Sequence, residues 1–359
     1  MAIVNDDHGF QLDVQPPVPV LPNISLDFNF SSMYLDELSD RTIDKRFYKT
    51  FEAGYESVKD GTTWGLVYFN ETFTQSLLSL LTIGSLDAED KEHSKIHVYM
   101  DNTNSQISVT LGFELLRGLE RFLVQLVTIP QDTLNVTLDM SRLVFPLEFE
   151  EPVYGTTDSS FTEFMAPGVI LTITYFMAVG LTALSFIIER KEGLLDRSWV
   201  AGVQSSEVML AHLATQMLVM LVQIALILVF MFPVFQLPCE GNMIWVVLIS
   251  VLQGFCGMTF GLMTSAISND ENTAIMMALG IFYPLILLSG IVWPIEGMPT
   301  GLRYVSYILP QTYACNSIRA ILYKGWDITY STVYLGYLIT TAWLFIHLAI
   351  TLIAIRIRK

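Results

Sequence analysis

The sequence predicts a multi-pass α-helical membrane protein with an N-terminal extracellular α/β domain. Hydrophobic residues make up 52% of the 359 residues and charged residues only 15%, an apolar excess too large for one soluble domain of this length. The net charge of −16 arises in residues 1–166, which hold 26 acidic and 10 basic side chains, whereas residues 167–359 hold nine of each. An acidic, water-facing domain (1–166) therefore precedes an apolar transmembrane domain (167–359). The acidity argues against binding of nucleic acid, whose phosphates would be repelled.

Five stretches of the second half contain no Asp, Glu, Lys or Arg and are long enough to cross a bilayer. A bilayer core needs ~20 consecutive apolar residues in a helix, because lipid offers no partner for backbone N–H and C=O groups. The same runs in a soluble protein would need a far larger polar shell than the chain supplies. The predicted spans are residues 167–188, 208–235, 243–268, 273–295 and 328–355.

Basic residues orient these spans. Basic residues follow the first span and the last span, so the positive-inside rule places these two segments in the cytoplasm. Arg303, Arg319 and Lys324, between the fourth and fifth spans, favour the opposite orientation. The residues that support the orientation are Arg190, Lys191, Arg197, Arg356, Arg358 and Lys359.

Glycosylation acceptors support the same topology, with the N-terminal half outside and the C-terminus cytoplasmic. All four Asn-X-Ser/Thr acceptors lie in the first half. Residues 1–12 show neither the basic nor the apolar region of a signal peptide that could start translocation. The simplest account is that an upstream transmembrane helix is missing and the chain is N-terminally truncated. The acceptors are Asn23, Asn29, Asn70 and Asn135.

Alternating strand and helix patterns predict an α/β domain in the first half. Residues 1–30 are expected to be irregular because four prolines between positions 16 and 22 interrupt them. Beyond them, the patterns predict strands at 64–68, 95–100, 136–138 and 143–149, and helices at 70–81 and 107–127.

Two polar segments of the second half carry the richest chemistry. Residues 189–207 are too polar to cross a membrane and predict a short amphipathic helix between the first two spans. In residues 296–327, Pro299 suits a helix start, Pro310 separates two short helices and Gly325 closes the second. The tyrosines of this segment and Trp326 are expected at the depth of the lipid headgroups.

Three segments resemble the ABC-2 type permeases, the membrane half of ABC exporters. Residues 161–168 (FTEFMAPG) look like the lead into the second membrane helix of these permeases. Residues 189–203 resemble their "RE-EG-x-x-(D/E)-R" cytoplasmic element, and residues 288–325 resemble their "LSG–P–MP–L–P–T–alR–G" signature. Among eukaryotic members, the chain looks most like the arthropod H subfamily, whose relatives are often labelled as G-family members.

The resemblance implies five spans of a six-helix fold, an ATPase domain ahead of it and a dimer that encloses the transport path. The chain lacks the G-x-x-x-x-G-K-[ST] phosphate loop and the first helix of the family pattern. It is therefore not expected to be an enzyme by itself and holds no cofactor of its own. ATP and Mg²⁺ would bind to the missing nucleotide-binding domain, on the same or a separate chain.

The resemblance also assigns two candidate sites. The cytoplasmic element would form a coupling loop that receives the ATPase domain, whereas its basic residues by themselves would only anchor span ends to lipid headgroups. The coupling-loop residues are Arg190, Glu192, Gly193, Asp196, Arg197 and Trp199. The outer re-entrant segment is marked by Pro294, Pro299, Pro310, Arg319 and Gly325.

The cysteines and histidines indicate no catalytic or metal site. Cys239 and Cys315 both fall on the predicted outer side, where one bridge or two free thiols are equally compatible with the sequence. His93 and His97 are four apart, but in a predicted strand that spacing separates them by ~13 Å, so they are expected to be solvated.

The function expected from the resemblance is outward export of lipid or another hydrophobic substrate across the plasma membrane. The predicted spans lack titratable carboxylates, which argues against an ion or proton pathway. A multi-pass receptor or adhesion protein with a glycosylated domain is the alternative from another class. A non-functional gene fragment is the third.

Overall fold

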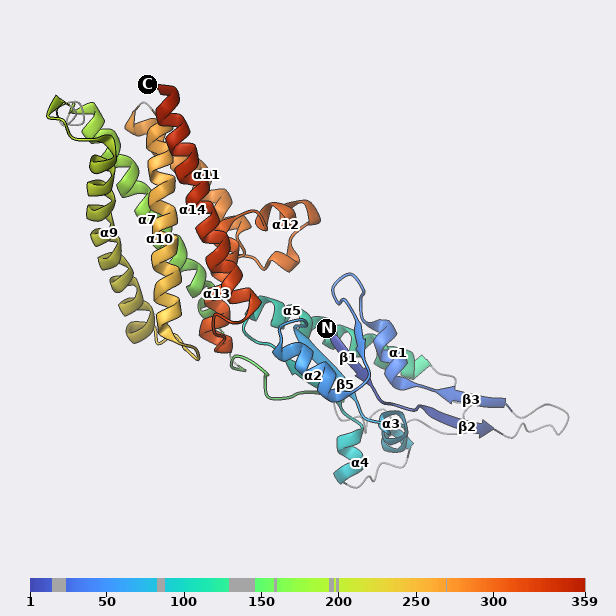
Figure 1. Ribbon diagram of the computed structural model, residues 1–359. Coiled ribbons are helices and arrows are strands. Elements are labelled where there is room, and N and C mark those ends of the chain that lie inside the picture. The colour runs from blue at the N-terminus through green and yellow to red at the C-terminus, as the bar shows by residue number, and fades with distance from the viewer. Residues whose placement is uncertain are drawn as a thin grey trace. The chain divides into compact units, whose positions relative to one another are not determined.

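The computed structural model describes residues 1–14, 24–82, 88–128, 146–157, 160–193, 197, 200–268 and 270–358 (Figure 1). The chain divides into two compact units, Met1–Ser159 (unit 1) and Ser160–Lys359 (unit 2).

A five-stranded mixed sheet forms the centre of unit 1. Its order is β4-β1-β5-β6-β7, and of the described pairs within this sheet the β5–β6 pair is antiparallel and the others are parallel. The strands are β1 (Ala2–Asn5), β4 (Arg46–Tyr48), β5 (Gly65–Phe69), β6 (Ile96–Met100) and β7 (Leu147–Phe149). The strands expected around residues 64–68 and 95–100 are confirmed, and β7 confirms residues 147–149 of the one expected at 143–149. Residues 136–138 and 143–145 lie outside the described residues.

The expectation that residues 1–30 are irregular is wrong. Strand β1 is buried and pairs on both of its edges, with β4 and β5. Strands β2 (Phe10–Val14) and β3 (Ile24–Phe28) form an antiparallel pair (Figure 1). The four prolines all fall in residues 15–23, outside the described residues, so they do not interrupt β1, β2 or β3.

Helices cover both faces of the sheet. One face packs against α1 (Phe30–Glu37), α3 (Phe73–Thr82) and α5 (Ser105–Thr128), with Phe69, Val98 and Phe122 in the shared core. The other face packs against α2 (Phe51–Lys59). The short helix α4 (Ala88–His93) precedes β6. Helix α3 begins at Phe73 rather than at residue 70 because Asn70 and Phe73 close a turn through a backbone hydrogen bond of 3.1 Å.

Five helices of unit 2 are long and apolar enough to cross a membrane, which confirms the number of predicted spans. Helix α9 continues into a π-helical turn, η2 (Phe230–Val234), that contains Pro233. The helices are α7 (Phe161–Lys191), α9 (Ser205–Val229), α10 (Met243–Ile267), α11 (Glu271–Leu288) and α14 (Ser331–Arg358).

The fourth helix is shorter than predicted. Helix α11 ends at Leu288, whereas hydropathy alone extends the span to residue 295. Gly290 adopts a φ of +76°, a left-handed conformation that an α-helix does not contain and that glycine adopts without strain. Residues 289–295 are therefore apolar without belonging to the helix.

Glycines let α10 approach α7 closely. A Cβ on Gly257 would lie 2.4 Å from the carbonyl oxygen of Tyr175, and one on Gly261 would lie 2.7 Å from that of Val179. Both glycines therefore face the α7 backbone directly, the arrangement that small residues allow between membrane helices. Helices α7 and α10 run in the same direction, since Gly257 meets Tyr175 and Gly261 meets Val179.

Three short helices lie between α11 and α14. They are η3 (Ile295–Gly297), α12 (Thr300–Ser306) and α13 (Pro310–Lys324). The predicted helix boundaries are confirmed. Pro299 is the N-cap of α12, Pro310 is the first residue of α13, and Gly325 ends α13 with a φ of +67°. Tyr323 and Trp326 are buried within the protein.

Candidate functional site

Arg319 on α13 joins three segments that are far apart in the sequence. One guanidinium nitrogen, Nη2, donates to the carbonyl oxygens of Phe164 at 3.2 Å and of Gly290 at 2.9 Å. The guanidinium also lies 4.2 Å from the centroid of the Phe164 ring, within the range of a cation–π interaction. Phe164 belongs to the first turn of α7, and Gly290 follows α11. We call this arrangement the arginine clamp.

The carbonyl of Gly290 is available because α11 stops there. It lies two residues beyond Leu288, the last residue of the helix, so it is outside the helical hydrogen-bond pattern and a donor from another element can satisfy it. In the described residues, Arg319 forms no ion pair with a carboxylate; its partners are backbone dipoles and an aromatic ring. A planar guanidinium with several donors suits this role better than an ammonium group.

Further polar contacts fix α13 against its neighbours. Toward α7, the Tyr323 hydroxyl donates to the carbonyl of Glu163, and Gln311 Nε2 donates to Thr172 Oγ1 at 3.4 Å. Toward α14, Ser317 Oγ lies 2.9 Å from the carbonyl oxygen of Thr332. A Cβ on Gly336 of α14 would overlap this hydroxyl. Helix α13 is thus held to α7, α14 and the end of α11 at once.

At their other ends, α7 and α11 meet through an ion pair. Lys191 Nζ lies 3.1 Å from Glu271 Oε1, which joins the last residue of α7 to the first of α11. Phe176 and Phe282 pack edge to face between the two ends, with ring centroids 4.0 Å apart. The two helices therefore contact each other at one end and midway, and the arginine clamp joins them at the other end.

The predicted coupling-loop residues lie near this ion pair in the chain. Glu192 and Arg197 are exposed, and Gly193 adopts a φ of +69°. The backbone N–H of Arg197 donates to the carbonyl of Gly193 at 3.2 Å. The Arg190 side chain and residues Asp196 and Trp199 lie outside the described part. Reasoning from sequence missed Glu271, because it follows Lys191 by 80 residues and no local pattern connects them.

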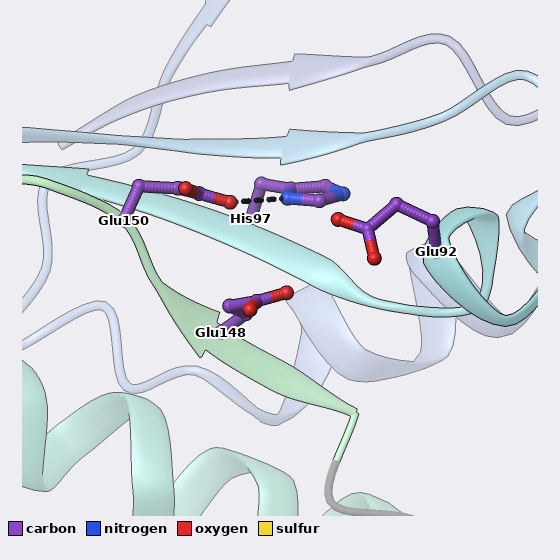
Figure 2. A group of neighbouring side chains, drawn as sticks. All are labelled: Glu92, His97, Glu148 and Glu150. Carbon is purple, nitrogen blue, oxygen red and sulfur yellow. Dashed lines mark hydrogen bonds and ion pairs between the residues drawn. The ribbon is translucent and has the colours of Figure 1, made fainter. Parts of the chain in front are cut away.

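Unit 1 contains a second cluster of titratable side chains, on β6, β7 and α4 (Figure 2). One ligand atom from each of its residues lies within 4.8 Å of the others, and His97 Nδ1 is 2.7 Å from Glu150 Oε1. The expectation of a solvated His97 is therefore wrong: the side chain is largely buried and hydrogen-bonded to a carboxylate 53 residues away. The cluster consists of Glu92, His97, Glu148 and Glu150.

Lys95 supplies the positive charge of this cluster. Its Nζ lies 2.7 Å from a carboxylate oxygen of Glu92 and 2.7 Å from one of Glu148. The two carboxylates raise the pKa of the Lys95 ammonium, and the hydrogen bond from Lys95 lowers the pKa of Glu92. A metal ion would have to displace this ammonium group, so the chemistry of the cluster is that of an ion-pair network.

The cysteine bridge that the sequence leaves open is not formed. Cys239 and Cys315 are both free thiols. Cys315 is fully buried in the core around α13, and the Cys239 thiol donates to the carbonyl of Gly241 at 3.3 Å.

Two of the four predicted glycosylation acceptors lie in the described part of unit 1. The Asn29 side chain caps α1 by accepting a hydrogen bond from the Ser32 amide at 2.9 Å. Asn70 is half-buried ahead of α3. Asn23 and Asn135 lie outside the described residues.

Comparison with known proteins places this architecture in a family. The chain matches the ABC-2 family transporter proteins over residues 1–355. It is 31% identical over 326 residues to ABC transporter G family member 20 of Dictyostelium discoideum, an alignment that covers 90% of this chain and 42% of that protein. It is 25% identical over 298 residues to G family member 23 of the same organism, covering 82% and 40% of the two chains.

A bacterial relative supports the same assignment. Inner membrane transport permease YhhJ of Escherichia coli is 30% identical over 158 residues, which cover 44% of this chain and 42% of the permease. The apolar helices and these similarities define an integral membrane protein of the permease class. The chain belongs to the ABC-2 transporter family, as its sequence motifs predict, and it spans less than half the length of these relatives.

Proposed function

We propose that the chain is the membrane-spanning part of an ATP-driven exporter that moves a lipid or another hydrophobic molecule outward. The observation that carries the proposal is the double connection between α7 and α11, through Lys191–Glu271 at one end and the arginine clamp at the other. Such a connection lets a displacement at one membrane surface reach the other, which an exporter requires. A protein that only anchors a receptor domain has no need of it.

We propose that the protein lies in the plasma membrane. Unit 1 is then outside the cell and the C-terminus is in the cytoplasm. The basic residues after the first and last spans and the acceptors in unit 1 support this orientation. The ends of α7 and α11 that carry Lys191 and Glu271 then face the cytoplasm, and the arginine clamp lies at the outer side.

The proposed partner is a nucleotide-binding domain that binds ATP and Mg²⁺, in the same polypeptide or in another chain. Segment 189–207 would receive its movement as the coupling loop, with the exposed Glu192 and Arg197 as charged contacts. Pulling this loop moves Lys191 and, through the ion pair, the start of α11. Two copies of the permease would enclose the transport path between them.

The path itself suits an apolar or amphipathic molecule. The predicted spans contain no Asp, Glu, Lys or Arg, and a membrane pathway for ions or protons is usually marked by such residues. The buried His347 of α14 packs against Phe260 and Trp343, so its surroundings are aromatic.

The decisive experiment reconstitutes the permease with its nucleotide-binding domain in proteoliposomes that contain a fluorescent phospholipid. We expect ATP-dependent transfer of the lipid between leaflets, and a several-fold decrease for Arg197→Ala and for Glu271→Ala at unchanged protein yield. Arg41→Ala, at an exposed position of unit 1, is the matched control and should leave transfer unchanged. Failure of ATP to drive transfer of any hydrophobic probe would contradict the exporter; normal transfer in Arg197→Ala would contradict only the coupling loop.

A further inference from the structure

Helix α5 of unit 1 carries two apolar stripes, and the described part of unit 1 packs against only one of them. Leu115, Leu119 and Phe122 are at most 1% exposed and pack on the sheet. A second stripe runs along the other side of the helix, where the described structure leaves the side chains 56–62% exposed. The most exposed residues of this outer stripe are Val109, Phe113, Val124 and Val127.

The spacing of the outer stripe is helical. Its members are 4, 11 and 3 residues apart, which is close to one, three and one helical turns and keeps them on one face of α5. The face is also hollowed: a depression of about 450 Å³ lies along Leu116, Leu123 and Val127. Apolar side chains at this exposure, spread along the helix from Val109 to Val127, are typical of a surface that another protein covers.

Two opposite charges lie on or beside this stripe. Arg117 and Glu120 are both exposed, and neither forms an ion pair or a side-chain hydrogen bond with the described residues. Their neighbour Arg121 differs, because its guanidinium is paired with Glu114 at 3.0 Å and Glu37 at 3.7 Å. Arg117 and Glu120 are therefore available to a partner that brings a negative and a positive charge in the reverse order.

A second copy of α5 is such a partner. If two α5 helices pair antiparallel about a two-fold axis that passes between them, level with positions 118 and 119, Arg117 of each copy lies opposite Glu120 of the other. The same axis places Phe113 opposite Val124, so aromatic and aliphatic side chains of the stripe meet as well. The outer stripe is thus complementary to itself in both charge and apolarity, as the symmetry of an isologous interface requires.

We infer that the outer stripe of α5 is the surface through which unit 1 of one chain binds unit 1 of a second copy, in antiparallel register. The inference rests on the proposed function only in that two copies assemble. It adds the surface, the register and the ion pairs. The pairing buries the exposed apolar residues of both copies and places an opposite charge beside Arg117 and beside Glu120.

Cysteine cross-linking tests the register. The background is the full chain with Cys239→Ser, which removes the half-buried thiol and leaves the two buried ones. Two differently tagged chains are co-expressed, one with Phe113→Cys and the other with Val124→Cys, and membranes are oxidised with copper phenanthroline. We expect a cross-linked species that carries both tags. Chains with only Phe113→Cys should not cross-link to each other, because the antiparallel register separates those positions by about 16 Å along the axis.

Charge reversal tests the ion pairs. Because each interface contains the pair twice, Arg117→Glu or Glu120→Arg alone should lower the cross-linked fraction about tenfold. The double variant, Arg117→Glu with Glu120→Arg, should restore it. Arg41→Glu, a reversal elsewhere on exposed unit 1, should have no effect. Equal amounts of the variants in the membrane establish that each chain folds.

Co-precipitation of the two tags separates this inference from the proposed function. If the copies co-precipitate but positions 113 and 124 do not cross-link, the α5 interface is wrong and the dimer stands. If the two copies do not co-precipitate, the α5 interface and the dimer of the proposed function are both wrong. Cross-linking of Phe113→Cys chains to each other, or of either position to a different protein only, would also overturn the antiparallel pairing.

Discussion

The main helices of the two units, α5 and α10, reach their neighbours in opposite ways. Helix α5 packs on a sheet through large side chains, and its buried stripe consists of leucine and phenylalanine. Helix α10 instead places Gly257 and Gly261 against the backbone of α7. In water, burial of large apolar side chains drives packing, whereas in lipid the apolar surroundings are equal on both sides and close backbone contact provides the attraction.

Polar groups follow the same division. In unit 1, charged side chains pair with charged side chains, as in Lys45–Asp40 at 2.8 Å and Lys95–Glu148 at 2.7 Å. In unit 2, the Lys191–Glu271 pair is exposed at the helix ends, and donors inside the helix packing reach backbone carbonyls: Arg319 reaches Gly290, Tyr337 reaches Trp245 and Trp343 reaches Ile308. A carboxylate costs far more to bury than a carbonyl, so an apolar unit stabilises its donors with the backbone.

The largest expected effect is on the glycine contact. Gly257→Val places a side chain where even a Cβ would lie 2.4 Å from the Tyr175 carbonyl oxygen, so α10 must separate from α7. We expect a loss of about 3 kcal/mol or more of stability and little monodisperse protein after extraction in detergent, measured by fluorescence-detected size-exclusion chromatography. The matched control is Gly280→Val on α11, where no atom lies within 4 Å of the added Cβ. Equal behaviour of the two variants would contradict the close contact.

The second largest loss of stability is expected when the arginine clamp is broken. Arg319→Met removes two charge-assisted hydrogen bonds and leaves the carbonyls of Phe164 and Gly290 without this donor, at a cost of about 2–4 kcal/mol. Arg319→Lys should recover only part of the loss, because an ammonium group lacks the planar fork. Thermal unfolding of the purified protein measures both. Full recovery by lysine would show that charge alone matters.

A single hydroxyl provides a smaller test. Tyr337→Phe removes the donor to the Trp245 carbonyl and keeps the ring that packs against Trp245, so we expect a loss of about 1 kcal/mol. Tyr334→Phe, at an exposed position of the same helix, should change the unfolding temperature by less. The reverse order would mean that the carbonyl bond does not stabilise the α10–α14 contact.

The smallest effect is expected for the ion-pair network of unit 1. Lys95→Met should lower stability by about 0.5–1 kcal/mol, since Lys95 and its partners are partly exposed. The pKa of Lys95 is raised and that of Glu92 is lowered. The contribution of Glu92 is therefore present above its ordinary pKa of 4.5 and is lost as the pH falls through its lowered value; that of Lys95 is lost as the pH rises through its raised value.

The pH dependence supplies the check. Unfolding of the wild type and Lys95→Met should differ between about pH 5 and pH 10 and converge in acid. Lys59→Met, which breaks an exposed i,i+3 pair with Glu56, is the control and should have a smaller effect. A Lys95→Met difference that persists unchanged at pH 3 would mean that packing, and not charge, is lost.

Local sequence signals predicted a large part of this fold. The five spans follow from apolar runs that have few other uses, and Pro310 and Gly325 marked both ends of α13 because their backbone restrictions act locally. Strand β1 was missed because its pairing with β4 joins residues more than 40 positions apart. The His97–Glu150 contact and the Lys191–Glu271 pair were missed for the same reason, since periodicity reports only on neighbours along the chain.

The sequence by itself determined that the second half consists of membrane helices, what family it belongs to and where several helices end. Only the tertiary structure decided which of those helices lie inside the protein. Within their most apolar stretches, 56% of the residues of α7 and α10 are buried, against 11% in α9 and α11. Hydropathy cannot distinguish a helix that faces lipid from one inside the protein, because lipid and a protein interior are both apolar. The close approach of α10 to α7 at Gly257 and Gly261 is what buries these two helices.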